Sequence, residues 1–181
     1  QRLPEEDPLG PTLLPPGPAE GEATMQTLLM PLLERAEATA SLQGRPWRGP
    51  DLWPQWIDQP SQDGTIAEIV ANLLENAFRY SPAGCSVGLC LLPDGLCVWD
   101  NGPPIPLEER DLIFERGARG STGQDRAGTG LGLALARSLA EQQGRKLTLC
   151  VEPSTIAPDL PAQGNAFVLS WPAGARPDPT T

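Results

Sequence analysis

Histidine is absent from the 181 residues of the sequence. Ser/His/Asp hydrolases, histidine-ligated zinc and histidine acid–base catalysis therefore cannot be built from this chain alone. Basic residues are also few, with 13 Lys and Arg against 23 Asp and Glu and a net charge of -10. A nucleic-acid interface requires clustered Lys and Arg, whereas here they are scattered, so we expect no nucleic-acid partner.

Long apolar runs and a signal-peptide layout are missing as well. No stretch approaches the roughly 20 apolar residues that a membrane helix requires, so we expect a cytoplasmic protein with no membrane segment in this chain. The four cysteines show no C-x-x-C spacing and lie in strand-like runs. Buried free thiols are the favoured interpretation, ahead of a disulfide or a metal cluster. They are Cys85, Cys90, Cys97 and Cys150.

The length suits one domain with a full core. Residues 1–22 are rich in proline, which predicts a linker or the remnant of a preceding helical domain. The folded domain is expected over residues 23–172, and residues 173–181 are expected to form a disordered tail.

An amphipathic pattern in the stretch Glu68–Pro82, with Ile66 just before it, predicts the central helix. Its apolar arc leaves Asn72, Asn76 and Arg79 together on the remaining side. Thr65 and Glu68 fit a capping box at its start. Asn is a poor helix former, and its amide oxygen is a suitable ligand for Mg²⁺. An ordinary amphipathic helix would show the same apolar pattern, so the helix alone does not establish a site.

The segment before this helix predicts one further helix and two strands. The helix spans residues 23–42, with Pro31 as a kink or a break. The strands, Arg45–Gly49 and Trp53–Ile57, are expected to pair antiparallel. Their tryptophans are expected to pack on the sheet rather than to form a ligand-stacking platform; they are Trp47, Trp53 and Trp56.

A hairpin is predicted by the strands Ser86–Leu92 and Leu96–Asp100 around Pro93-Asp94-Gly95. The prolines that follow cannot continue a sheet, so Asp100 is expected at a strand end, where its carboxylate can face a pocket. Asp-Asn-Gly is equally compatible with a simple turn. Leu107–Phe114 predicts a short helix, and Glu115–Ala127 predicts a mobile lid.

Glycines precede the last predicted helix, which extends to Gln143-Gly144. They expose backbone N–H groups at a helix N-terminus, where phosphate binds readily. Two paired strands are then expected over Lys146–Val151 and Asn165–Trp171. The glycine-rich segment runs Gly128, Thr129, Gly130, Leu131 and Gly132.

Four stretches in this order resemble the catalytic ATP-binding domain of sensor histidine kinases, in the GHKL or Bergerat-fold superfamily. N-L-L-E-N-A-F-R-Y-S-P is similar to the N box, D-N-G-P-P-I to the first glycine box, I-F-E-R-G-A-R-G to the F box and G-T-G-L-G-L-A to the second glycine box. The resemblance covers Met25–Pro172 and is nearest to the cyanobacterial and chloroplast type. It implies a two-layer α/β sandwich, a mixed, mostly antiparallel sheet covered on one face by about three helices.

The resemblance also implies ATP and Mg²⁺ as cofactors and assigns roles to residues. Asn76 would bind Mg²⁺, with Asn72 as a catalytic position one turn earlier, and Asp100 would accept a hydrogen bond from adenine. Arg119 would be a catalytic cation near the γ-phosphate. The remaining nucleotide contacts would come from Arg79, Tyr80, Gly102, Ile105, Gly128, Thr129, Gly130, Leu131 and Gly132.

Asn72 stands where hydrolysing superfamily members carry a water-activating glutamate. The resemblance therefore implies phosphoryl transfer to a histidine on a dimerisation domain absent from this chain, then to a response regulator, with a homodimer in the full-length protein. Pro104 and Gly117-Ala118 depart from the family pattern near the adenine pocket and the lid. A degenerate, nucleotide-free signalling module therefore stays open as an alternative, as does a GHKL-type ATPase or serine kinase.

Overall fold

The computed structural model describes residues 23–61, 64–115 and 132–172, which form a five-stranded sheet and three α-helices. The strand order is β1-β2-β3-β5-β4, with β1 parallel to β2 and every other pair antiparallel. The helices are α1 (Met25–Gln43), α2 (Thr65–Tyr80) and α3 (Gly132–Gln142). The strands are β1 (Trp47–Arg48), β2 (Val87–Leu92), β3 (Gly95–Asp100), β4 (Lys146–Cys150) and β5 (Asn165–Ser170).

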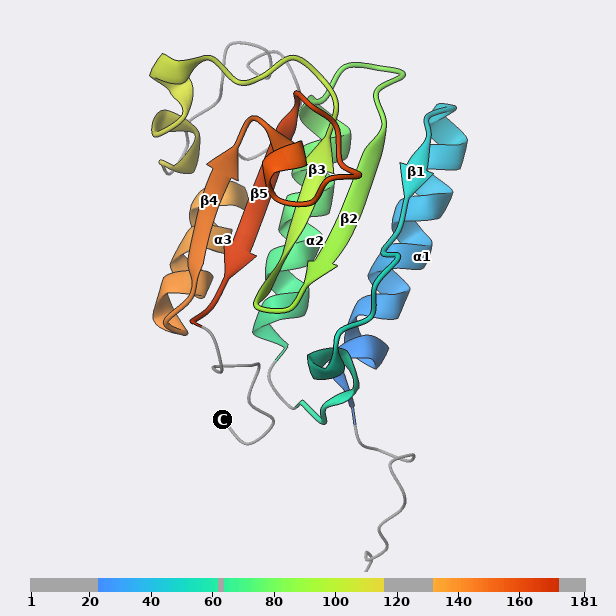
Figure 1. The fold of residues 1–181 in the computed structure, drawn as a ribbon, viewed down its shortest axis with the longest axis vertical. Coiled ribbons are helices and arrows are strands. Elements are labelled where there is room, and N and C mark those ends of the chain that lie inside the picture. The colour runs from blue at the N-terminus through green and yellow to red at the C-terminus, as the bar shows by residue number, and fades with distance from the viewer. Residues whose placement is uncertain (1–22, 62–63, 116–131, 173–181) are drawn as a thin grey trace, which may run out of the picture.

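All three α-helices cover the same face of the sheet (Figure 1). Successive strand residues point to opposite faces, so alternate residues of β2, β3 and β5 meet the helices. The resulting main core combines the buried stripe of α2 with side chains from each of these strands. The expected mixed, mostly antiparallel sheet with helices on one face is confirmed.

The opposite face of the sheet carries a smaller apolar cluster. Cys97 and Trp99 of β3 and Ala166 of β5 are buried there beneath Leu160. Leu160 belongs to the connection between β4 and β5, which crosses this face in Figure 1. Both faces of the central strands are therefore covered, which explains why all six residues of β3 are buried.

The first helix is confirmed, and Pro31 neither breaks nor ends it. Thr24 caps its start through a reciprocal pair of hydrogen bonds with Thr27. Gly44, with φ of 67°, ends it in the left-handed conformation that favours glycine. The hairpin and the two C-terminal strands are also confirmed, with the latter paired antiparallel.

The expected antiparallel pair between residues 45 and 57 is wrong. Only Trp47–Arg48 forms a strand, and its partner is β2 in parallel register. Pro50 and Pro54 lack backbone N–H groups and so cannot donate to a sheet, and Gln55–Asp58 forms the 3₁₀ turn η1.

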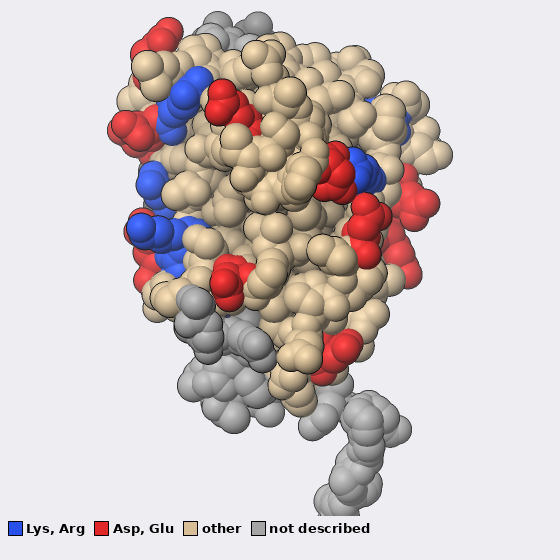
Figure 2. All heavy atoms as spheres, in the orientation of Figure 1, with Lys and Arg blue, Asp and Glu red and all other residues tan. Residues whose placement is uncertain are grey.

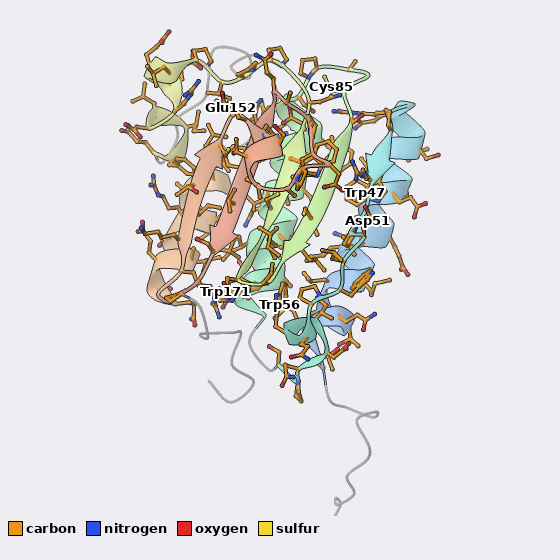
Figure 3. The ribbon with its side chains drawn as sticks, viewed as in Figure 1. Trp47, Asp51, Trp56, Cys85, Glu152 and Trp171 are labelled. Carbon is orange, nitrogen blue, oxygen red and sulfur yellow. The ribbon has the colours of Figure 1, made fainter. Side chains whose placement is uncertain are left out.

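The tryptophans of this segment differ in their surroundings. Trp56 is buried on η1, where its indole N–H donates to the Leu92 carbonyl at 2.8 Å and its ring meets Trp171 edge-on (Figure 3). Trp47 stacks on Phe78 of α2. Trp53 is 44% exposed, so its expected packing on the sheet is wrong.

Three local expectations also need correction. Gly64, not Thr65, is the N-cap of α2, and Glu68 donates its backbone N–H to the Gly64 carbonyl, so the capping box does not form. The expected helix over residues 107–114 is two 3₁₀ turns, η2 (Leu107–Glu109) and η3 (Leu112–Phe114). Only two of its side chains are buried, too few to pack an α-helix. The four cysteines are free thiols, but only Cys97 is fully buried.

Candidate functional site

Asp100 is the last residue of β3 and lies at the end of the sheet. It follows Leu96 and Val98 at period two, so it points to the helix-covered face. Its side chain is only 6% exposed, and its register partner across the sheet is Asn165, the first residue of β5. The structure therefore brings a buried carboxylate and a buried amide together.

Asn165 holds the chain that follows Asp100. Its Oδ1 accepts the backbone N–H of Ile105 at 2.8 Å, and its Nδ2 donates to the Pro103 carbonyl at 2.9 Å. Nδ2 also lies 3.4 Å from Asp100 Oδ1. Two hydrogen bonds to the backbone and one contact with the carboxylate thus hold residues 100–105 in a defined conformation.

The Asp100 carboxylate is held through one of its oxygens. Oδ1 accepts the Gly102 backbone N–H at 2.8 Å in addition to the Asn165 contact. Among the described residues, none donates a hydrogen bond to Oδ2. Burial raises the pKa of Asp100, against the lowering influence of the Gly102 N–H, the Asn165 amide and the Arg45 charge. The carboxylate is therefore an acceptor whose surroundings do not fully compensate its charge.

Two glycines allow the backbone to pass close to Asp100. A Cβ on Gly164 would overlap the Asp100 carbonyl oxygen. A Cβ on Gly102 would come within 3.0 Å of both Asp100 Oδ1 and Pro82 Cδ. Asn101, exposed beside them, accepts the Ser86 N–H at 2.8 Å through Oδ1. A larger residue at Gly102 would crowd the carboxylate, and one at Gly164 would clash with the Asp100 backbone.

The polar face of α2 holds the other predicted residues that the structure describes. Asn72 Nδ2 donates to the Glu68 carbonyl at 3.2 Å, and Asn72 Oδ1 lies 3.7 Å from the position of a Cβ on Gly132, the first residue of α3. Asn76 is half-buried, and no described residue is hydrogen-bonded to its amide. Arg79 forms an ion pair with Glu75 at 2.8 Å.

Tyr80 ends α2 and is half-buried, and Ile105 packs partly against the core. The Ile105 carbonyl also accepts a hydrogen bond from Arg110 Nε at 2.9 Å. Arg119, Gly128, Thr129, Gly130 and Leu131 lie outside the described residues, as does the predicted lid from residue 116 onwards. Their assigned roles stay predictions.

Sequence reasoning missed two residues that support this region. Asn165 could have been found, because it continues the inward alternation of Phe167 and Leu169 with a polar side chain. Arg45 is 7% exposed and donates to the Cys85 carbonyl at 2.9 Å and to Ser81 Oγ, which ties the end of α1 to the chain leaving α2. Cys85, labelled in Figure 3, lies two residues before Val87, the register partner of Asp100, and so at the same end of the sheet. No local pattern marked Arg45.

A groove of about 580 Å³ between α1 and α2 is lined by Asn72 and Arg79 but not by Asp100. Leu32 and Ala36 of α1 and Leu74 and Phe78 of α2 form its apolar wall.

On the face drawn in Figure 2, acidic and basic side chains are interspersed among neutral ones. Among the described helices, none is long and apolar enough to span a bilayer.

Comparison with known proteins matches residues 62–175 to the family described as "Histidine kinase-, DNA gyrase B-, and HSP90-like ATPase". The chain is 35% identical to Sensor histidine kinase Hik2 of Thermosynechococcus vestitus over 159 residues, covering 83% of this chain and 39% of that protein. It is 34% identical to Sensor protein KdpD of Escherichia coli, covering 64% of this chain and 13% of KdpD. The chain thus spans less than half the length of these relatives.

Solved structures share the fold. The mycobacterial sensor histidine kinase MprB superposes with a TM-score of 0.59 at 27% identity, covering 83% of this chain and 97% of that one. Full-length ShkA in complex with AMPPNP superposes with a TM-score of 0.61 at 21% identity, covering 88% of this chain and 32% of ShkA.

Proposed function

The chain belongs to the histidine kinase-, DNA gyrase B- and HSP90-like ATPase family, and we propose that it is the catalytic ATP-binding domain of a sensor histidine kinase. It would bind ATP with Mg²⁺ and present the γ-phosphoryl group to a histidine on a dimerisation domain outside this chain. A response regulator would receive the phosphoryl group next, and the full-length protein would act as a homodimer in the cytoplasm. The observation that carries this proposal is the buried carboxylate of Asp100, in which the described residues donate hydrogen bonds to Oδ1 but not to Oδ2.

Asp100 supplies selectivity for adenine in this proposal. Its Oδ2 has no donor among the described residues, so the exocyclic amino group of adenine complements it. Guanine carries a carbonyl oxygen at the corresponding position, which would face the carboxylate as a second acceptor. A buried acceptor opposed by another acceptor is penalised by about 1–3 kcal/mol, so adenine is preferred.

The polar face of α2 supports the phosphates. The half-buried Asn76 amide has no partner among the described residues and is a suitable hard ligand, so it would hold Mg²⁺, which would neutralise phosphate charge. Arg79 and Tyr80 would lie along the phosphates and the sugar, with Arg79 exchanging its ion pair with Glu75 for phosphate. Gly102 and Ile105 would border the adenine.

The phosphate chain and the transferring group would be held by residues beyond α2. Backbone N–H groups at Gly128, Thr129, Gly130, Leu131 and Gly132 would contact the phosphates, as expected for glycines before a helix. Arg119 would lie near the γ-phosphate as the catalytic cation.

Asn72 favours phosphoryl transfer over hydrolysis. An amide cannot remove a proton from water, and its Nδ2 already donates to the Glu68 carbonyl. The γ-phosphoryl group would therefore wait for an imidazole, which this chain lacks. Asn72 would act by positioning the start of α3, beside which it lies.

Calorimetric titration with a Mg-ATP analogue tests the proposal. The native chain should bind it and prefer adenine to guanine nucleotides, and Asp100→Ala should abolish that preference. Asp94→Ala is the matched control, because Asp94 is exposed in the turn at the other end of the same hairpin. An absence of binding at millimolar nucleotide would instead support the nucleotide-free signalling module.

Incubation with labelled ATP tests the phosphoryl acceptor. The chain alone should carry no acid-labile label, and a separately produced dimerisation domain from the full-length protein should acquire it. Steady phosphate release by the chain alone would favour a GHKL-type ATPase and would show that Asn72 does not prevent hydrolysis.

A further inference from the structure

Two cysteines lie directly opposite each other on neighbouring strands. Cys90 of β2 and Cys97 of β3 are register partners in an antiparallel pair, so both side chains project from the same face of the sheet. Opposed residues in such a pair have Cα atoms about 4.5–5.5 Å apart. A disulfide needs about 4.4–6.8 Å, so this backbone can be bridged without moving a strand.

The two thiols differ in access. Cys97 is fully buried in the outer apolar cluster, whereas Cys90 is half-buried at its margin. The Cys97 thiol donates a hydrogen bond that lowers the pKa of Cys90, against burial, and the Arg48 charge also lowers it. The same hydrogen bond and burial raise the pKa of Cys97. Cys90 is therefore the thiol that ionises and meets a reagent first.

Three charged residues, Arg48, Asp51 and Asp159, lie close enough to Cys90 to influence its pKa. Arg48 of β1 binds Asp159 through both its carbonyl and its carboxylate, and it also pairs with Asp51 at 3.4 Å. The two carboxylates oppose the effect of Arg48 on the pKa of Cys90. This cluster pins the connection between β4 and β5 over the sheet beside the dithiol.

The other cysteines do not belong to this pair. Cys150 lies on β4 opposite Ala166 of β5, so β5 separates it from β3, and its thiol contacts the Glu152 carbonyl. Cys85 precedes β2, and burial raises the pKa of its thiol. Among the described residues, no group of three potential metal ligands is found.

We propose that Cys90 and Cys97 form a thiol–disulfide site that reacts with low-molecular-weight disulfides such as glutathione disulfide. The Cys90 thiolate attacks one sulfur of glutathione disulfide, which forms a mixed disulfide and releases one glutathione. Cys97 then loses its proton and attacks the Cys90 sulfur, and the second glutathione leaves with that proton. The cysteines lose two electrons and two protons, and glutathione disulfide becomes two glutathiones.

Peptide mapping of the whole chain across a series of glutathione redox buffers tests this proposal. After an acid quench and alkylation, cleavage before Asp94 cuts the chain between the two cysteines. In oxidising buffers the fragment that carries Cys90 and the fragment that carries Cys97 should stay joined until they are reduced. The joined species should be lighter than the sum of the two reduced fragments by two hydrogen atoms. Cys150 should remain alkylated.

Four variants identify the partners. Cys85→Ala is the matched control and should leave the joined fragments unchanged, because the fragment before Asp94 carries both Cys85 and Cys90. Cys90→Ala should abolish the link. Cys97→Ala and Cys97→Ser should also abolish it and retain glutathione on Cys90, since the resolving thiol is missing.

Two results would overturn the proposal. One is alkylation of Cys90 and Cys97 throughout the redox series, and the other is a link that is lost in Cys85→Ala but kept in Cys90→Ala. Because Cys90 is only half-buried, Cys90→Ala provides the decisive comparison even where substitution of the buried Cys97 impairs folding.

Discussion

Asn165→Ala is the substitution that tests most directly how the candidate site is held. The side chain makes two short hydrogen bonds to backbone groups, at 2.8 Å from the Ile105 N–H and at 2.9 Å to the Pro103 carbonyl. It also contacts the Asp100 carboxylate at 3.4 Å. Alanine removes all three interactions while keeping the residue compatible with a strand.

The expected loss of stability follows from these contacts. Each buried polar group left without a partner costs about 1–3 kcal/mol. Pro103 is exposed and Ile105 is half-buried, so water can replace part of each interaction. We therefore expect Asn165→Ala to lower the free energy of unfolding by about 2–3 kcal/mol, towards the lower end of that range for two groups.

Asn101→Ala is the matched control. Asn101 is the neighbouring asparagine, but it is exposed and makes one hydrogen bond, to the Ser86 N–H at 2.8 Å. Its loss should cost about 0.5–1 kcal/mol. Urea unfolding followed by tryptophan fluorescence measures both variants. Equal losses for the two substitutions would refute the idea that Asn165 organises residues 100–105.

Three further substitutions have defined outcomes. Because burial raises the pKa of Asp100, the native protein should lose stability as the pH rises from the ordinary aspartate pKa of about 3.9 towards the raised value. Asp100→Asn should not show this loss. Unfolding midpoints measured across pH test both expectations. Trp56→Phe should cost about 1–2 kcal/mol in urea unfolding, through loss of its indole hydrogen bond and a small cavity. Gly88→Ala should cost about 1–3 kcal/mol in the same assay, because its Cβ would overlap the Trp99 ring; Gly64→Ala, with open space around it, should cost far less.

Much of the fold could be predicted because its elements have strong local periodicity. The α2 helix carries its whole core-facing stripe within sixteen residues, and the β2–β3 hairpin is marked by Pro93, Asp94 and Gly95. The resemblance to sensor histidine kinases is confirmed by the relatives found. These signals lie within short stretches of sequence, so they need no knowledge of distant contacts.

The errors fall where distant contacts decide the structure. β1 is only two residues long and pairs in parallel with a strand 40 residues later, which no local pattern indicates. Trp56 resembles a strand residue in sequence, yet Leu92 and Trp171 hold it on a 3₁₀ turn. Asn165 lies 65 residues from Asp100, and only the register of β3 with β5 brings them together.

Asp100 connects the stability of the fold with the proposed chemistry. A strand end that needed only a turn could carry an exposed aspartate, whose charge would be solvated. Here the carboxylate is buried, and the Gly102 N–H, the Asn165 amide and the Arg45 charge do not offset the desolvation that raises its pKa. All its hydrogen bonds from described residues reach Oδ1, which leaves Oδ2 for a donor from elsewhere. A preorganised binding site holds such a group in place even though the group costs stability. The Asp100 carboxylate, with Oδ2 open, meets this requirement, and it therefore carries the proposal of nucleotide binding.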